Sequence, residues 1–404
     1  MYRMQAIRSI FGVAVAALFL LPMGASAAAA SRPLEISGWI PYWRVATGTE
    51  DALQHLDAFA EINPFVYTLK SDGTLKDNGN LSEEPWTSFF VAARQKGVRI
   101  VPTIMTSNGD LVHKLLSNSK SRIALEDRIA AMVKDSNFDG IDIDFEGKYA
   151  KTKAYFSLFL KGLSMRLGNK YLSCTVEART PPSDAYKTPP KTLQYANDFA
   201  ALNAYCNRVK FMTYDQRTAD LALNRKNSAV IYAPIADPLW VEKAIRLASK
   251  QILKEKIVIG AATYGYEYRI GGEVGNYTYS ILWSFNPRYA EQITSLYGVV
   301  AARNSAGEMG LAYVPTTTQA LIGADIGVAK PVSEDNGFNP VPTNVSATSQ
   351  NHLQSAFRYL AWSDAQAISD KISLAQKLGV RGVAIFKIDG GEDPRMWDVL
   401  GSQK

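Results

Sequence analysis

The sequence of 404 residues predicts an α/β fold, a (β/α)8 TIM barrel with a small α+β insertion between its seventh and eighth strands. Three observations lead to this prediction. Short β-branched or apolar runs alternate with helical patterns, which is typical of a parallel sheet covered by helices. Eight such runs occur, the number that closes a barrel. One interval of about ninety residues breaks the rhythm and is too long for a bare loop.

The strand candidates are short apolar runs bounded by turn residues. In chain order they are Glu35 to Trp43, Ile62 to Leu69, Val98 to Thr106, Asp139 to Glu146, Leu172 to Ala178, Val209 to Asp215, Ile257 to Tyr266 and Gly382 to Asp389. Helical patterns with apolar residues three and four positions apart fill most of the gaps. They include Ser121 to Ser136, Ala154 to Gly168 and Asp364 to Gly379, the last with a capping Asp and a closing Gly.

The first 27 residues have the pattern of a secretory signal peptide. Arg3 and Arg8 are positive, Ile10 to Leu21 is apolar, and Ala25-Ser26-Ala27 offers a small-residue cleavage site. We therefore expect a secreted protein, located in the medium, the periplasm or the cell wall. No second apolar stretch of spanning length follows, so we expect no integral membrane segment.

We expect residues 28–404 to form one barrel domain, with the insertion over residues 267–354. Hydrophobic residues at 47% and charged residues at 20% are typical of a globular chain with a sizeable core. The formal charge of +6 fits an excess of surface lysines, and attraction to an anionic wall polymer is the alternative. We expect a monomer without a nucleic-acid partner.

The cysteines and histidines indicate no metal site. Cys174 lies at the start of one predicted strand and Cys206 just before the next, so an exported protein could join them in a disulfide or keep two buried thiols. His55, His113 and His352 are scattered among unrelated segments. Since nothing has zinc-ligand spacing, we expect no metal and no cofactor.

The segment NFDGIDIDFEGKY, residues 137–149, contains an unusual row of acids. Asp142, Asp144 and Glu146 alternate with bulky apolar residues, so the acids share one face of a strand. The apolar face suits packing against helices, which directs the acids into the barrel with Glu146 nearest the rim. Carboxyl groups this close cannot all ionise cheaply, so some pKa values are expected to rise. A carboxylic acid that is protonated near neutral pH is what a general acid requires.

Two other structures could gather acids in one segment. An exposed edge strand disagrees with the bulky apolar residues on the opposite face. A calcium loop disagrees with the spacing, which lacks the glycine and the later glutamate of the EF-hand. Neither alternative explains the alternation as well as a buried catalytic strand.

Two motifs resemble those of a known family. DGIDIDFE, residues 139–146, matches the DGxDxDxE fourth-strand signature of family 18 glycoside hydrolases, the chitinase family. FMTYD, residues 211–215, matches the Met-Thr-Tyr-Asp motif on their sixth strand. The resemblance covers essentially the whole of residues 28–404, because the family also has an α+β insertion between strands seven and eight.

Within that family the chain is similar to the bacterial spore-cortex and cell-wall N-acetylglucosaminidase branch. The segments NPFVYTLKSDGTL, ATYGYEY and residues 358–388 carry this similarity. The third strand has IMTSNGD in place of the Ser-x-Gly-Gly of typical chitinases. Phe386 stands where the family usually has a broad Trp beneath the sugar.

The resemblance implies a secreted retaining hydrolase of β-1,4-linked N-acetylglucosamine glycans, with peptidoglycan favoured over chitin. The 2-acetamido oxygen of the sugar would attack its own C1 and form an oxazolinium ion. Glu146 would be the acid and then the base. Asp144 would hold the acetamido N–H, and Asp142 would share a proton with Asp144. The alternative is a non-catalytic sugar-binding protein, against which the intact acid argues.

Further residues are candidates for substrate contact. The resemblance assigns Tyr214 to the acetamido oxygen and Asp215 to the distorted sugar. Candidates for the wall of the sugar site are Met212, Tyr42, Phe386, Tyr67 and Trp240. Asp139 has the wrong spacing for the inward face, so we expect a turn or capping role for it. Glu177, at the end of the fifth strand, has an uncertain facing.

Overall fold

The computed structural model describes residues 33–315 and 357–403. The expected signal peptide and residues 316–354 of the expected insertion lie outside this part of the chain. None of the helices within the described ranges is long and apolar enough to cross a membrane.

In the described part of the chain, eight parallel strand positions close into a barrel because β1 pairs with both β2 and β15. The barrel strands are β1 (Glu35–Pro41), β2 (Glu61–Leu69), β4 (Arg99–Ile100) continued by β5 (Thr103–Thr106), β6 (Gly140–Phe145), β7 (Tyr171–Glu177), β8 (Arg208–Met212), β9 (Ile257–Ala262) and β15 (Gly382–Phe386). All eight predicted strands are present, and the predicted (β/α)8 fold is confirmed. A short strand, β3 (Leu75–Asp77), pairs with the outer part of β2.

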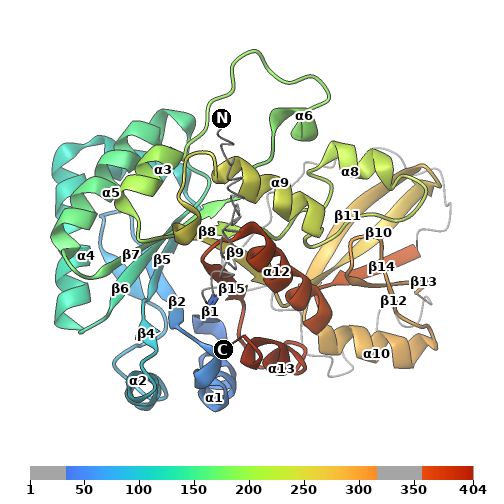
Figure 1. The fold of residues 1–404 in the computed structure, drawn as a ribbon, viewed down its shortest axis with the longest axis horizontal. Coiled ribbons are helices and arrows are strands. Elements are labelled where there is room, and N and C mark those ends of the chain that lie inside the picture. Colours follow the sequence, from blue (N-terminus) through green and yellow to red (C-terminus); the bar gives the residue numbers. More distant parts are fainter. Residues whose placement is uncertain (1–32, 316–356, 404) are drawn as a thin grey trace, which may run out of the picture. The chain divides into compact units, whose positions relative to one another are not determined.

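Helices surround the barrel (Figure 1). They are α1 (Val45–Gln54), α2 (Trp86–Gln95), α3 (Gly109–Ser117), α4 (Ser119–Asp135), α5 (Lys153–Leu167), α6 (Pro182–Ala185), α7 (Phe199–Tyr205), α8 (Leu221–Lys226), α9 (Pro238–Ala248), α12 (Ala365–Leu378) and α13 (Met396–Gly401). The three predicted helices correspond to α4, α5 and α12. Asp364 caps α12 by accepting from the Ala367 N–H, and Gly379 ends it with a φ of 66°.

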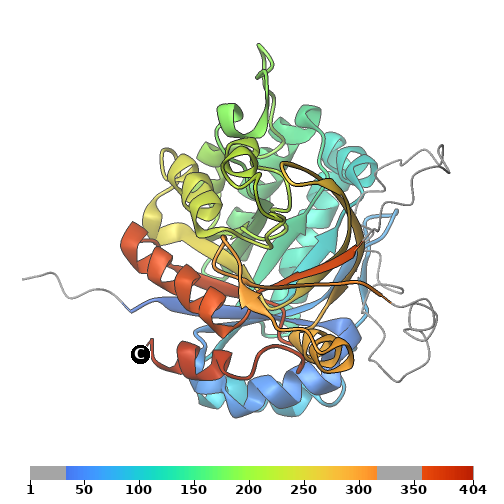
Figure 2. The same ribbon diagram turned by 90° about the vertical axis from the view of Figure 1, so that its right-hand side faces the viewer.

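A second sheet lies between β9 and β15 in the chain, in the interval where the insertion is expected. Its order is β11-β10-β14-β13-β12, and all its pairings are antiparallel. The elements are β10 (Gly265–Glu273), β11 (Asn276–Phe285), α10 (Pro287–Tyr297), β12 (Ala302–Arg303), β13 (Met309–Tyr313) and β14 (Phe357–Trp362). This sheet curves beside the barrel with α10 below it (Figure 2). Tyr264, Tyr266 and Tyr268 pack in one cluster with Tyr214, which joins the sheet to the carboxyl end of β8.

The apolar residues of β6 face the helices, as the alternation predicts. Ile141, Ile143 and Phe145 are fully buried, and the Phe145 ring stacks on Phe159 of α5 with 5.7 Å between centroids. Burying each such side chain contributes about 2 kcal/mol. Because these residues fix the outer face of β6, the acids at alternate positions must face the interior.

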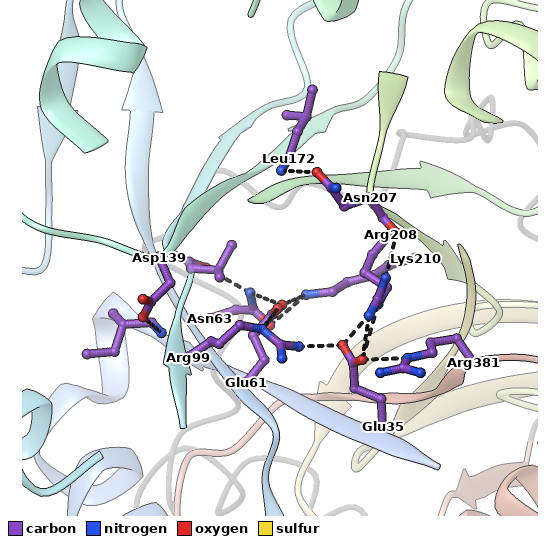
Figure 3. Close-up of polar contacts among 12 residues, drawn as sticks. Glu35, Glu61, Asn63, Arg99, Asp139, Leu172, Asn207, Arg208, Lys210 and Arg381 are labelled. Carbon is purple, nitrogen blue, oxygen red and sulfur yellow. Dashed lines mark hydrogen bonds and ion pairs between the residues drawn. The ribbon is translucent and has the colours of Figure 1, made fainter. Parts of the chain in front are cut away.

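The amino ends of the strands are closed by an ion-pair network (Figure 3). The Glu35 carboxylate accepts from Arg99 at 2.6 Å, Arg208 at 2.8 Å and Arg381 at 2.6 Å. Deeper in the barrel, Lys210 Nζ donates to Glu61 at 2.8 Å. These residues lie opposite the catalytic end of a TIM barrel, where side chains contribute to stability.

Cys174 of β7 and Cys206, just before β8, form a disulfide with 6.1 Å between their α-carbons. The sequence left a disulfide and two buried thiols open, and the structure has the disulfide. It ties together two strands that are already paired in the barrel.

Candidate active site

The three acids of β6 lie in the barrel in the predicted order. Asp142 is fully buried, Asp144 is 4% exposed, and Glu146 is partly exposed just beyond the end of the strand. The row therefore runs from the interior to the carboxyl end of the barrel. This is the end at which TIM-barrel enzymes hold their active sites.

Asp142 is held by donors from three other strands. It accepts from Trp39 Nε1 of β1 at 3.1 Å, Thr103 Oγ1 of β5 at 2.9 Å and Thr175 Oγ1 of β7 at 2.9 Å. Hydrogen bonds to a buried carboxylate are strong because the alternative is an unsolvated charge. These three donors therefore hold the Asp142 side chain in one orientation at the inner end of the row.

Asp144 differs from Asp142 in lacking such donors. Its Oδ1 atom is buried and has no hydrogen-bond partner among the described residues. Burial, followed by the charges of Glu146 and Asp142, raises the pKa of Asp144 well above its ordinary value. A protonated Asp144 next to the buried, hydrogen-bonded Asp142 is the arrangement in which the two groups could share a proton.

Glu146 has the properties of a general acid that can also act as a base. Burial, followed by the charge of Glu177, raises its pKa to about 7, against the opposing effect of Lys148. At neutral pH a substantial fraction of this carboxyl is therefore protonated. An acid with a pKa near the working pH can donate a proton in one step and accept one in the next.

A narrow cavity of about 10 Å³ lies over the acids. Its lining includes five predicted site residues, which are Asp144, Glu146, Met212, Tyr214 and Phe386. The Tyr214 ring is stacked on Phe386 with 5.6 Å between centroids and 15° between planes. The two acids thus share a cavity with one aromatic ring from the segment directly after β8 and one from the end of β15.

Asp215 is fixed by the insertion sheet and the segment before it. It accepts from the hydroxyls of Tyr264 at 2.8 Å and Tyr266 at 2.7 Å. Its φ of 58° is uncommon for a residue with a side chain and is often found at functional sites. The hydroxyls of these two tyrosines therefore hold the Asp215 side chain in place.

Some predicted contacts are not brought to the cavity. Trp240 of α9 packs in the core and is 5% exposed, so it does not line the cavity at which we expected it to contact the sugar. Tyr67 is 7% exposed and Tyr42 is half-buried, and neither lines the cavity over the acids. Asp139 accepts from the Ile100 N–H of β4 at 2.8 Å near the amino end of β6, so its bond joins two strands and is not the turn or capping contact that we expected (Figure 3).

Several residues of the site were missed by the sequence analysis. Trp39, Phe65 and Thr175 line the cavity, and Lys148 acts on the charge of Glu146. Trp39 and Thr175 have the parity of inward-facing residues on their strands, and this alternation is the signal that could have found them. The burial of Lys148 follows from a turn after β6 and has no signal in the spacing.

The described residues include no group of three or more His, Cys, Asp or Glu side chains that could hold a metal ion. A larger cavity of about 1100 Å³ lies between α1, α10 and the segment after β15, and none of the predicted catalytic residues lines it. The predicted catalytic residues Asp144, Glu146 and Tyr214 thus line the narrow cavity and not the larger one.

A (β/α)8 barrel with an acid of raised pKa at the carboxyl end of its fourth strand, beside aromatic rings, suits acid-catalysed cleavage of a glycosidic bond. A sequence model described as "Glycosyl hydrolases family 18" matches residues 39–391. The chain belongs to this family, and the predicted resemblance is confirmed.

Two relatives by sequence and one solved structure are similar to this chain. The cortical fragment-lytic enzyme of Bacillus cereus is 22% identical over 364 residues, covering 85% of this chain and 70% of the relative. The uncharacterized glycosylase YvbX of Bacillus subtilis is 23% identical over 202 residues, covering 48% of this chain. The match spans 55% of YvbX, so the chain covers only about half of that relative.

The third relative is a solved structure. The class V chitinase of Pseudomonas fluorescens Pf-5 superimposes with a TM-score of 0.67 at 20% identity, covering 92% of this chain and 99% of the chitinase. At this identity the likeness concerns the fold.

Proposed function

We propose that this protein is a secreted retaining hydrolase that cleaves β-1,4 bonds in N-acetylglucosamine glycans with assistance from the substrate's acetamido group. The observation that carries the proposal is the buried, unpartnered Oδ1 of Asp144, between the donor-bound Asp142 and the acid Glu146. A buried polar atom without a partner is costly, and an acetamido N–H would satisfy it.

The reaction would proceed in two steps, formation of the oxazolinium ion and its hydrolysis. Glu146 gives its proton to the glycosidic oxygen as the acetamido oxygen attacks C1, so the leaving sugar departs and an oxazolinium ion remains. The Glu146 carboxylate then takes a proton from water, whose oxygen attacks C1 and reopens the ring. Two displacements at one carbon retain its configuration. No second enzyme carboxylate is needed as a nucleophile.

The neighbouring residues would stabilise the charge that develops. Asp144 would accept a hydrogen bond from the acetamido N–H and stabilise the positive charge of the oxazolinium ion. Asp142 would share the proton of Asp144. Tyr214 would donate to the acetamido oxygen, Asp215 would contact the distorted sugar, and Met212 and Phe386 would form the wall of the site.

Peptidoglycan is the favoured substrate and chitin is second. Support comes from the wall-branch segments in the sequence and from the name of the cortical fragment-lytic relative. The signal-like residues 1–27 agree with action on a polymer outside the cell. The intact Glu146 favours hydrolysis over sugar binding alone.

Two measurements test this proposal. Glu146→Gln should abolish turnover while leaving folding and glycan binding intact, whereas the exposed Glu255→Gln should keep wild-type turnover. Full activity of Glu146→Gln would refute the acid assignment. Mass spectrometry of products from purified peptidoglycan and from chitin oligomers, digested side by side, identifies the substrate. Exclusive release of chitin fragments would overturn the preference for peptidoglycan.

A further inference from the structure

Lys148 is a buried ammonium beside the catalytic acid. Its side chain is 0% exposed, and Nζ has no hydrogen-bond partner among the described residues. Nζ lies 3.8 Å from Glu177 Oε2 and 4.8 Å from the centre of the Phe156 ring on α5. Gly147, between Lys148 and the acid, has a φ of 62°, so the chain turns sharply there.

Glu177 connects this lysine to the backbone of the acid. Its Oε1 accepts from the Gly147 N–H at 3.1 Å, and its Oε2 accepts from Asn197 Nδ2 at 2.9 Å. One carboxylate at the end of β7 therefore contacts both the residue that follows Glu146 and the ammonium of Lys148. The sequence left open which way Glu177 faces. In the structure its carboxylate faces the turn directly after Glu146.

The charges around Glu146 explain why a lysine is buried there. The carboxylates that act on Glu146 come from Glu177 on β7 and Asp215 after β8. Those that act on Lys148 are Glu177, Asp144 on β6 and Glu146 itself. Lys148 is the cation that opposes them. Burying an ammonium costs several kcal/mol unless opposite charges compensate. The ring of Phe156 supplies only a weak cation–π contact.

We propose that Lys148 and Glu177 are positioning residues for Glu146, a charge pair that holds the turn after the acid and sets the pH range in which the acid works. This proposal rests on the proposed function, because it assigns Glu146 as the general acid. Neither residue needs to touch the substrate.

The two members of the pair act in opposite directions. Glu177 raises the pKa of Glu146, and Lys148 lowers it. Burial lowers the pKa of Lys148 itself, against the carboxylates of Glu177, Asp144 and Glu146. Removing the charge of Lys148 should therefore raise the pKa of Glu146, and removing the charge of Glu177 should lower it.

The test is the pH dependence of kcat/KM on N-acetylglucosamine oligomers. Because Glu146 must be protonated in the free enzyme, kcat/KM falls as the pH rises through its pKa. Lys148→Met should move this alkaline limb up by about one pH unit, and Glu177→Gln should move it down by about as much. Lys148→Arg should leave it near the wild-type position. The double variant Lys148→Met/Glu177→Gln should lie between the single variants.

A matched control separates charge from stability. Lys371 of α12 is another buried lysine, 2% exposed, whose Nζ has no hydrogen-bond partner among the described residues. Lys371 is not among the charges that act on Glu146, so Lys371→Met should leave the alkaline limb in place whatever its effect on the melting temperature. If Lys148→Met and Glu177→Gln also leave the limb in place, the pair is only structural and the proposal is overturned.

Failure of the proposed function can be told apart from failure of this inference. The Glu146 carboxyl can be titrated by NMR with ¹³C-labelled glutamate, without substrate. Opposite shifts in the two variants support the charge pair even if no glycan is cleaved. An unchanged titration in both variants overturns it even in an active enzyme.

Discussion

Trp39 Nε1 donates a hydrogen bond to Asp142 Oδ2 over 3.1 Å, although the two residues are 103 positions apart in the sequence. The contact crosses the barrel interior, since β2 and β5 lie between β1 and β6 in the sheet. Asp142, the innermost acid of the row, is therefore oriented in part by the first strand of the fold. The row depends on the closed barrel and not on β6 alone.

Trp39→Phe should reduce catalysis more than folding. The ring contact with Phe386, 5.9 Å between centroids, would largely persist, but Asp142 would lose one of its donors. A hydrogen bond to a charged group contributes about 1.5 to 3 kcal/mol. We expect kcat to fall at least about tenfold. Steady-state kinetics on chito-oligosaccharides, with urea unfolding as the control, checks this. An unchanged kcat would show that Asp142 needs only its threonine donors.

Tyr264→Phe and Tyr266→Phe should each weaken the hold on Asp215, because each removes one hydroxyl donor. We expect kcat/KM to fall by roughly tenfold in each single variant. The double variant should lose more than the product of the two, because the first loss leaves the second donor in place. Tyr186→Phe, at an exposed tyrosine, is the control. Wild-type kinetics in the double variant would show that the position of Asp215 does not matter for catalysis.

Loss of the disulfide should affect stability and not chemistry. Cys174 and Cys206 are 32 positions apart, and a loop of this length predicts a stabilisation of about 3 to 4 kcal/mol from the unfolded chain. Replacing both cysteines by serine should lower the free energy of unfolding by about that amount. Activity per folded molecule should not change. Equal stability of the variant and the wild type would contradict the expectation.

Glu35 should make the free energy of unfolding depend on pH in the acidic range. Although burial alone would raise its pKa, Arg208, Arg99 and Arg381 lower it to about 2, from 4.5 in a free side chain. A depressed pKa gives stability that is present above about pH 4.5 and lost as the pH falls toward 2. The contribution is about 3 kcal/mol. Unfolding of the wild type and of Glu35→Gln between pH 2 and 6 tests this. A constant stability difference over that range would disagree.

The fold and the acid row could be predicted because both follow from local patterns. The alternation in residues 139–146 places Asp142, Asp144 and Glu146 on one face without knowledge of any other strand. The run from Asp364 to Gly379 includes its own start and stop signals, and α12 follows them closely.

The rest of the site depends on contacts between distant segments. Trp39 and Thr175 reach Asp142 only after the barrel closes, and neither has a distinctive motif. Trp240 looked like a sugar-stacking residue because an aromatic side chain alone cannot be assigned to core or cleft, and it packs in the core. Nothing in the residue pattern indicates the burial of Lys148, which follows the turn at Gly147.

The central claim is that Glu146 and the substrate's acetamido group cleave the glycan with retention. Proton NMR of the first minutes of hydrolysis of an N-acetylglucosamine oligomer measures the anomer that is released. The account predicts that the β-anomer appears first and then mutarotates to the mixture. Initial release of the α-anomer would mean direct attack by water, and would contradict the claim.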